Sequence, residues 1–233
     1  ALRPIEAFIT VWQRWCEKTA HGVVTVVGGG AAGVEIALAM AWQLQPQRAR
    51  VSLQLVAGRR GVLPELPQGV RRRVLAHLTQ AHIDVIDADA VALDRTSIQL
   101  AHGATVHSDW TLVATGSAAA AWPREAGLAV DERGFIKTLS TLQSSSHPFV
   151  FAAGDCASLS EHPRARSGVY AVLAGAPLAQ NLRRLSVGAS LRPYVPQKRA
   201  LYLLSTGRRH AIASWGAWSF EGDWVWRWKD WID

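Results

Sequence analysis

The sequence predicts an α/β fold in which helices pack against a parallel β-sheet. The apolar, largely β-branched run Val23–Val27 is typical of a strand buried on both faces. A helical segment and a second strand-like segment, residues 50–56, follow it, and this strand–helix–strand order favours parallel pairing. Between residues 84 and 107, short strand-like pieces lie close together with turn residues between them. They predict a small antiparallel meander inserted into the parallel-sheet domain.

The first helices are indicated by the spacing of their apolar residues. Residues 4–19 predict an amphipathic helix because their apolar positions recur every three to four residues. Residues 31–44 are apolar almost all round, which predicts a deeply buried helix that Pro46 ends. Residues 67–82 predict a helix with a basic face. The apolar positions of the first helix are Phe8, Val11, Trp12, Trp15 and Cys16.

The meander is expected to contain short strands joined by turns. Ala101-His102-Gly103-Ala104 has the composition of a hairpin turn. After the meander, residues 110–114 predict a further buried strand that ends in Thr115-Gly116-Ser117. The strands of the meander are expected at residues 84–86, 91–94, 97–101 and 105–107.

The second half of the chain is richer in loops. Residues 149–153 predict a short apolar strand that runs into Gly154-Asp155. A carboxylate at the end of a buried strand is well placed to bind a ligand hydroxyl, although an Asp there can also cap a turn. Residues 168–185 predict a helix with a long apolar face, preceded by Arg164 and Arg166.

The C-terminal residues are rich in tryptophan. Residues 200–204 and 210–215 predict two strands, and six of the eleven Trp residues lie at or after the end of the second strand. Three of them alternate with other residues, which is the spacing of a strand. We expect a core edge or a subunit contact here, with an interfacial membrane anchor as the alternative. The alternating residues are Trp224, Trp226 and Trp228.

Composition excludes several classes of protein. Of the 233 residues, 49% are hydrophobic and 18% charged, which is typical of a globular chain and not of a disordered one. No apolar run reaches about 18 residues, the length that a transmembrane helix needs. The eight His residues and the two thiols, Cys16 and Cys156, show no ligand spacing, so no metal site is expected. Unpaired thiols and the lack of a signal-peptide pattern favour a cytoplasmic location.

The net charge of +7 comes from 25 basic and 18 acidic residues. Much of the excess lies between Ser158 and His210. Because no nucleic-acid-binding motif accompanies it, we interpret it as a solvated or partner-facing surface and expect no nucleic acid partner. Positive charge near the phosphates of bound dinucleotides is a further alternative.

The glycines after the first strand carry the clearest chemical signal. Gly28 permits a tight turn, Gly30 lets the backbone approach a phosphate, and Gly33 lets the helix lie close to the strand. The free N–H groups of Ala31 and Ala32 at the helix start, together with the helix dipole, favour an anion. This strand–turn–helix therefore predicts the pyrophosphate site of a dinucleotide.

The end of the second strand bears on which dinucleotide binds. An acidic residue there would bind the ribose 2′-hydroxyl, but this chain has Ala57, followed by Gly58 and the basic pair Arg59 and Arg60. An Arg at this place can pair with a 2′-phosphate, which would favour NADPH. Exposed loop charges without a ligand are the alternative.

Two further motifs extend the signal beyond one glycine turn. Val113-Ala114-Thr115-Gly116 and Phe149–Ala157, which contains Gly154-Asp155, follow in order with the meander in between. Together these segments resemble the pyridine nucleotide-disulfide oxidoreductase superfamily of flavoproteins with two dinucleotide-binding domains. The resemblance implies that Gly28 to Glu35 belongs to a Rossmann-like nicotinamide domain and that Ala114 to Gly116 returns the chain to the flavin domain. It also implies that Asp155 binds the flavin ribityl chain and that the helix start at Gly168 and Val169 points toward the flavin ring.

Within the superfamily the chain looks like the type II NADH dehydrogenase-like branch. Residues 202–233 resemble the end of the oxidoreductase portion found fused ahead of selenide, water dikinase. The resemblance places the flavin-binding glycine turn upstream of Ala1, so we expect a fragment that holds only the C-terminal part of a FAD-binding domain. The expected domains are residues 1–19, a helix remaining from the FAD domain; 20–116, the NAD(P)-binding domain; 117–199, the C-terminal part of the FAD-binding domain; and 200–233, a Trp-rich β segment.

The function implied is that of a FAD-dependent NAD(P)H oxidoreductase, in which hydride passes from nicotinamide to flavin and then to an acceptor. The cofactors carry the chemistry, so no side chain is assigned as catalytic. Glu35 is a polar candidate near the nicotinamide, or an ordinary acid at a helix start. Cys156 is expected to be a small buried hydrophobe. The alternative is a non-catalytic dinucleotide-binding or redox-sensing module of a larger fusion protein.

The expected partners follow from the same resemblance. They are a small-molecule or quinone-like electron acceptor and a fused or associated selenophosphate synthetase domain. A homodimer is left open, and membrane contact is expected to be peripheral at most.

Overall fold

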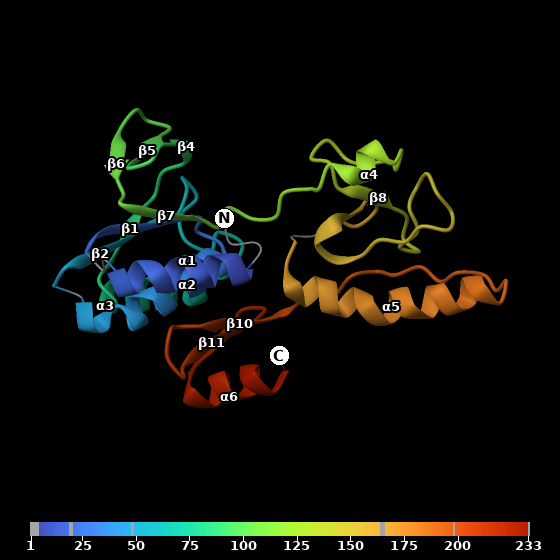
Figure 1. Ribbon diagram of the computed structural model, residues 1–233. Coiled ribbons are helices and arrows are strands. Elements are labelled where there is room, and N and C mark those ends of the chain that lie inside the picture. The colour runs from blue at the N-terminus through green and yellow to red at the C-terminus, as the bar shows by residue number, and fades with distance from the viewer. Residues whose placement is uncertain (1–4, 19–20, 48, 164–165, 198, 233) are drawn as a thin grey trace. The chain divides into compact units, whose positions relative to one another are not determined.

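The computed structural model describes residues 5–18, 21–47, 49–163, 166–197 and 199–232. The chain folds as two compact units (Figure 1). Unit 1 combines residues up to Gly116 with those from Leu201 onward, and unit 2 spans Ser117–Ala200.

Unit 1 contains the predicted parallel sheet. Its strands are β1 (Gly22–Val27), β2 (Val51–Val56), β3 (Ile83–Ile86) and β7 (Trp110–Val113), in the order β3-β2-β1-β7. Every pair is parallel. The α/β class predicted from the glycine turn and the strand–helix–strand order is therefore confirmed.

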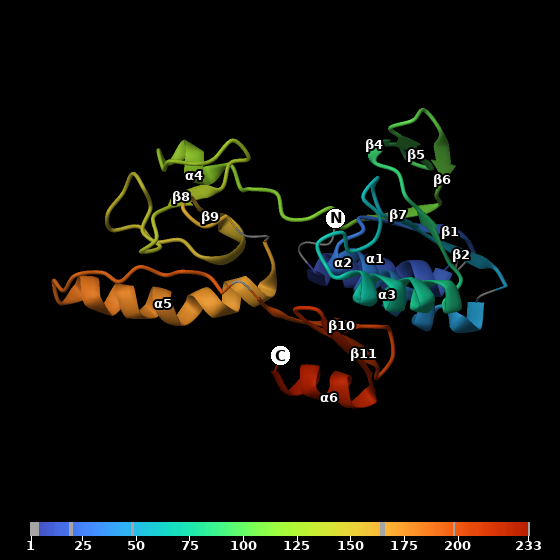
Figure 2. The ribbon, with the colours of Figure 1, turned by 180° about the vertical axis from the view of Figure 1, so that it is seen from behind.

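The two faces of this sheet are covered by different elements. Alternate residues such as Val24 and Leu55 pack with the helices, whereas Val27 and Val56 pack with the meander. Figure 2 shows the helices on one side of the sheet and the meander on the other. The helices are α1 (Ile5–Lys18), α2 (Ala31–Gln43), the short 3-10 helix η1 (Gln45–Gln47) and α3 (Gln68–Gln80).

The meander has three strands, β4 (Ala90–Leu93), β5 (Ser97–Leu100) and β6 (Thr105–His107), and its neighbouring strands are antiparallel. Its hairpin turn is confirmed, with the Leu100 N–H donating to the Ala104 carbonyl at 2.9 Å. The assignment of residues 84–86 to the meander is wrong, because they belong to β3 and pair in parallel with β2. Ile83 and Val85 pack against the main core. The alternation of apolar residues over only four positions does not reveal which strand such a segment pairs with.

The C-terminal residues form a second layer on the helices. β10 (Leu201–Ser205), β11 (Ala211–Trp215) and β12 (Trp218–Gly222) make an antiparallel sheet, and Leu204 and Ile212 join the main core. β12 contacts α3 through Glu221. Partial burial alone would raise the pKa of the Glu221 carboxyl, but the hydrogen bond from His77 and the charge of Arg73 lower it.

The predicted strand at Trp224, Trp226 and Trp228 is wrong. These residues lie in a helix, α6 (Asp223–Ile232), which starts directly after Gly222, where φ is +147°. In a helix Trp224, Trp228 and Trp231 share one face, because they stand four and then three residues apart. That face is exposed while Val225 is buried, so the pattern is amphipathic and helical.

Unit 2 holds α4 (Trp122–Glu125), β8 (Ile136–Thr138), the 3-10 helix η2 (Gly154–Cys156), β9 (Ala157–Leu159) and the long helix α5 (Gly168–Ser186). β8 and β9 pair in parallel. The predicted helix at residues 168–185 is confirmed. The predicted strand at residues 149–153 is wrong: all five are described, and only Phe151 makes a single bridge, to Gln143. Phe149 is 81% exposed, so this apolar run follows a turn and does not enter a sheet core.

The buried amide of Asn181 joins α5 to the segment that follows it. Its Nδ2 donates to the carbonyl oxygens of Thr141 at 2.9 Å and Arg192 at 2.8 Å, and its Oδ1 accepts the Arg192 N–H at 2.9 Å. Asn181 is 1% exposed, so every one of these bonds is made away from water.

Asn181→Asp is therefore expected to destabilise unit 2 by about 3 kcal/mol or more, because a carboxylate would face two carbonyl oxygens in a buried site. Thermal unfolding followed by circular dichroism measures the loss. Gln180→Glu, the same amide-to-acid change at an exposed neighbour on α5, is the matched control. Equal unfolding midpoints for the two variants would show that the Asn181 bonds do not hold the segment.

Candidate functional site

The glycine turn between β1 and α2 is closed to side chains at two of its positions. Gly28 has a φ of +135°, and a Cβ there would lie 2.3 Å from the Ala114 carbonyl oxygen. A Cβ on Gly33 would lie 1.9 Å from the Gly28 carbonyl oxygen. Both distances are far below van der Waals contact, so the turn and the close approach of α2 require glycine at both positions.

Gly30 differs because the space beside it is open. Apart from its own neighbours in the chain, no described atom lies within 4 Å of a Cβ built there. Gly30 is the N-cap of α2, makes no side-chain cap, and accepts the first helical bond from the Val34 N–H at 3.0 Å. The N–H groups of Ala31 and Ala32 precede that bond and have no partner within the helix. An open helix start with an exposed Gly30 fits the phosphates of a dinucleotide.

Residues predicted from two later segments meet this turn. The Gly28 N–H donates to Val56 at the end of β2, and the Ala114 N–H donates to Val27 at 2.7 Å. A Cβ on Gly29 would lie 2.4 Å from the Ala57 carbonyl oxygen. Ala57 and Ala114 therefore flank the turn on either side. Thr115 and Gly116 follow Ala114 directly and are exposed.

The basic residues after β2 are exposed and face acids. The Arg59 N–H donates to Asp89 Oδ1 at 3.0 Å, and its side chain, 84% exposed, approaches Asp89 Oδ2 at 3.5 Å. Arg60 pairs with Glu65 at 2.6 Å. Each pair is solvated and contributes little to stability, so either guanidinium can turn to another anion at small cost.

Glu35 has a structural contact that the sequence did not predict. Its Oε1 accepts the Ser205 N–H at 2.8 Å, which joins α2 to β10. Glu35 thus ties the C-terminal sheet to the helix that starts at the glycine turn. Its proximity to a nicotinamide stays a prediction.

Unit 2 contains a cavity of about 330 Å³ beside the start of α5. Gly154, with φ +71°, lies at its wall, and a Cβ there would lie 3.1 Å from the Ala171 Cβ. Ser167 and Tyr170 line it from the first turn of α5, which begins at Gly168 and Val169 as predicted. Asp155 is half-buried in η2, next to Gly154.

Arg166 and Asp131 form the charged part of this cavity. The Arg166 guanidinium lies 3.4 Å from the Phe135 ring centroid and 3.4 Å from Asp131 Oδ2. Burial alone would raise the pKa of Asp131, but hydrogen bonds from the Phe135 N–H and the Ser158 hydroxyl, with the Arg166 charge, lower it. Burial and the charge of Arg133 lower the pKa of Arg166. A held guanidinium at a cavity wall suits an anionic or oxygen-rich ligand.

Two buried polar atoms of the cavity wall lack partners. Arg166 Nε and Ser167 Oγ make no hydrogen bond to any residue that the structure describes. Buried donors are normally satisfied, so these atoms fit a ligand with hydrogen-bond acceptors. The cavity volume is at the lower end of the range for ligand pockets.

Sequence reasoning missed most of this cavity and misplaced Cys156. The thiol is exposed, not buried, and its Sγ donates to the Ala153 carbonyl at 3.3 Å. Cys156 lies in the 3-10 helix η2, whose other two residues, Gly154 and Asp155, have no apolar side chain. Arg166 was visible ahead of the predicted helix, whereas Arg164 lies outside the described residues. Asp131, Ser158 and Tyr194 gave no signal, because only the fold brings them together.

The C-terminal sheet and α6 expose a run of aromatic side chains. Trp218, Phe220 and Trp224 follow one another at ring-centroid distances of 6.5 and 6.4 Å. Trp231, 83% exposed, continues the surface along α6. None of the helices described for this chain is long and apolar enough to span a membrane.

Comparison with known proteins agrees with this architecture. The chain is 30% identical over 210 residues to ferroptosis suppressor protein 1 of Xenopus tropicalis and 30% identical over 219 residues to that of Xenopus laevis. Each match covers 84% of this chain and 54% of the relative, so the chain spans about half the length of these curated relatives.

Solved structures share the fold at low identity. The sulfide:quinone oxidoreductase of Aquifex aeolicus superposes with a TM-score of 0.72 at 16% identity, over 96% of this chain and 59% of that one. The reduced CoADR-RHD of Bacillus anthracis superposes with a TM-score of 0.66 at 20% identity, over 95% of this chain and 38% of that one. A sequence model of one family matches residues 6–177, well over half of the chain. By that match, the chain belongs to the pyridine nucleotide-disulphide oxidoreductase family.

Proposed function

We propose that the chain is part of a FAD-dependent NAD(P)H oxidoreductase that passes electrons to a quinone-like acceptor. The observation that carries the proposal is the open helix start at Gly30, framed by Gly28 and Gly33. Membership of the family supports the use of both cofactors, and the fold shared with the sulfide:quinone oxidoreductase supports a quinone-like acceptor. When bound, nicotinamide and flavin supply hydride transfer.

The chain's own residues would bind and orient these groups. The N–H groups of Ala31 and Ala32 would hold the pyrophosphate of the nicotinamide nucleotide, between the flanking Ala57 and Ala114. In unit 2, Arg166 and Ser167 would donate to the flavin nucleotide at the cavity wall. We propose the same flavin-facing roles for Gly154, which lines the cavity, and for its neighbours Asp155 in η2 and Gly168 and Val169 at the start of α5.

The activity is tested with the purified chain and added FAD. Absorbance in the flavin bands after gel filtration shows whether FAD is retained, and oxidation of NADH or NADPH with a soluble quinone measures turnover. Retained flavin with quinone-dependent oxidation supports the proposal. A colourless protein that still binds NADH would support the second candidate, a non-catalytic dinucleotide-binding module.

The remaining partners are also proposals. A fused or associated selenophosphate synthetase domain rests on the sequence resemblance alone, and a cytoplasmic location rests on the two unpaired thiols. The exposed aromatic run from Trp218 to Trp231 is where we place a subunit contact or a peripheral membrane contact. Gel filtration with light scattering and vesicle co-sedimentation distinguish the two.

The coenzyme preference is expected to depend on Arg59. Arg59→Ala should weaken the binding of NADPH about tenfold and change the binding of NADH by no more than about twofold. The reason is that a charge-assisted bond to the 2′-phosphate contributes roughly 1.5 kcal/mol. Parallel titrations by calorimetry measure both affinities, and Arg60→Ala extends the series. Arg95→Ala removes an exposed charge from the same unit and is the control. If Arg59→Ala weakens both coenzymes equally, the guanidinium does not read the 2′-phosphate.

A further inference from the structure

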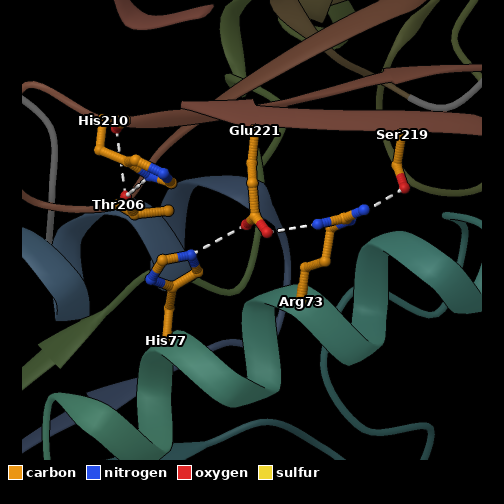
Figure 3. A network of polar contacts seen from close by, with 6 residues as sticks. All are labelled: Arg73, His77, Thr206, His210, Ser219 and Glu221. Carbon is orange, nitrogen blue, oxygen red and sulfur yellow. Dashed lines mark hydrogen bonds and ion pairs between the residues drawn. The ribbon is translucent and has the colours of Figure 1, made fainter. Parts of the chain in front are cut away.

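Three metal-ligating side chains meet where α3 packs against the C-terminal sheet. Figure 3 shows His77 on α3, Glu221 on β12 and His210 next to β11 pointing toward one another. One donor atom from each lies within 4.8 Å of the other two, and all three residues are half-buried. His77 Nε2 is 3.1 Å from Glu221 Oε2, and the two imidazole centroids are 5.0 Å apart. Within the described part of the chain, this is the one such group of three.

Neighbouring residues hold the donors in place. Arg73 pairs with Glu221 Oε1 and also donates from Nε to Ser219 Oγ at 3.2 Å, which leaves Oε2 facing His77 (Figure 3). Metal-binding carboxylates are commonly fixed in this way by a second hydrogen bond.

Thr206 orients the imidazole ring of His210. The Thr206 hydroxyl donates to the His210 carbonyl oxygen at 3.1 Å and lies 2.8 Å from Nδ1. We assign the hydroxyl proton to the carbonyl oxygen, so that the hydroxyl oxygen accepts the Nδ1 proton; in this tautomer the lone pair of the imidazole lies on Nε2. Orientation of a ligating His by a hydrogen bond at its other nitrogen is the usual arrangement in metal sites.

We propose that His77, His210 and Glu221 bind a divalent transition metal of the Zn²⁺ class. Two imidazole nitrogens and one carboxylate oxygen are a donor set of zinc, with water completing the coordination. The His77 and Glu221 side chains are 24% and 30% exposed, so water and a cation can reach them. With metal–donor distances of about 2.0–2.2 Å, binding needs side-chain shifts of roughly an ångström.

Metal binding would cross-link parts of unit 1 that are distant in the sequence. The cation would join α3 to β12 and to the residue before β11, in the C-terminal sheet that Glu35 also joins to α2. Since the unfolded chain lacks the arranged donors, the metal stabilises the folded unit. This site is separate from the glycine turn and does not depend on the proposed oxidoreductase activity.

The test uses the purified full chain after dialysis against a chelator. We expect Zn²⁺ to bind with 1:1 stoichiometry by calorimetry, and Co²⁺ to give visible absorption bands without thiolate charge transfer. A hundredfold excess of Zn²⁺ over its Kd should raise the unfolding midpoint by about 5 °C or more. We expect each of three substitutions to weaken the affinity for Zn²⁺ at least tenfold: His77→Ala, His210→Ala and Glu221→Gln.

The control is His107→Ala. His107 lies 3.2 Å from Asp109, the same kind of histidine–carboxylate contact, but among the described residues it belongs to no group of three donors. Its loss should leave the 1:1 binding unchanged. Thr206→Val keeps all three donors and should weaken binding by a smaller factor, which keeps the test usable if a ligand variant fails to fold. Absence of 1:1 binding in the wild type, or an affinity unchanged by both His77→Ala and His210→Ala, would overturn the proposal.

Discussion

Gly30→Val is expected to weaken NADH binding at least tenfold while leaving the unfolding midpoint within about 2 °C of the wild type. The space beside Gly30 is open, since no described atom lies within 4 Å of a Cβ built there apart from its chain neighbours. Its backbone angles, φ −76° and ψ 177°, are extended and suit valine. The same side chain would occupy the volume that a pyrophosphate needs at the start of α2. A tenfold loss corresponds to about 1.4 kcal/mol.

Gly30→Ala gives the graded control. It should weaken the binding of NADH less than Gly30→Val does, because the smaller side chain fills less of the space that the pyrophosphate needs. Titration followed by tryptophan fluorescence measures both variants. An affinity for NADH that is the same in wild type and Gly30→Val would place the nucleotide elsewhere.

Gly33→Ala is expected to act on folding itself. The added Cβ would lie 1.9 Å from the Gly28 carbonyl oxygen, which is backbone and cannot turn away. Either α2 moves off β1 or the turn opens, and both disturb the main core. The expected loss is about 3 kcal/mol or more, which lowers the unfolding midpoint by about 6 °C or more.

The matched control is Gly175→Ala. Gly175 lies inside α5, and no described atom stands within 4 Å of a Cβ built there. Alanine should be neutral or stabilise the helix by up to about 1 kcal/mol. Thermal unfolding compares the two substitutions directly. If Gly33→Ala unfolds at the wild-type midpoint, the close packing of α2 on the turn is not required for the fold.

The sequence predicted most elements of unit 1 because their apolar patterns are long. The run at Val23–Val27 and the glycine spacing left little choice of structure. Short segments were harder. Residues 149–153 looked like a strand but form a loop, and Trp224 to Trp228 fit both a strand and a helix period over so few residues. Only the exposed face shared by Trp224, Trp228 and Trp231 separates the two readings.

The candidate sites also differ in how much of each could be predicted from the sequence. The glycine turn is local, so its residues could be named from the sequence. The cavity wall at Asp131 and Arg166, and the group of His77, His210 and Glu221, bring together residues from distant segments. No spacing rule describes such groups, because tertiary packing of α3 on β12 or of α5 on its loops creates them. Glu35 was predicted from the glycine motif as a residue near the nicotinamide, but the structure also gives it a hydrogen bond from the Ser205 N–H that the sequence did not predict.

The central claim is that the start of α2 holds the nicotinamide nucleotide. Hydrogen exchange of the chain with and without saturating NADH, followed peptide by peptide by mass spectrometry, tests it most directly. We expect protection in peptides that cover Gly28 to Glu35, because the N–H groups of Ala31 and Ala32 would bond to phosphate. Unchanged exchange there, with NADH bound or with protection confined to other peptides, would contradict the claim.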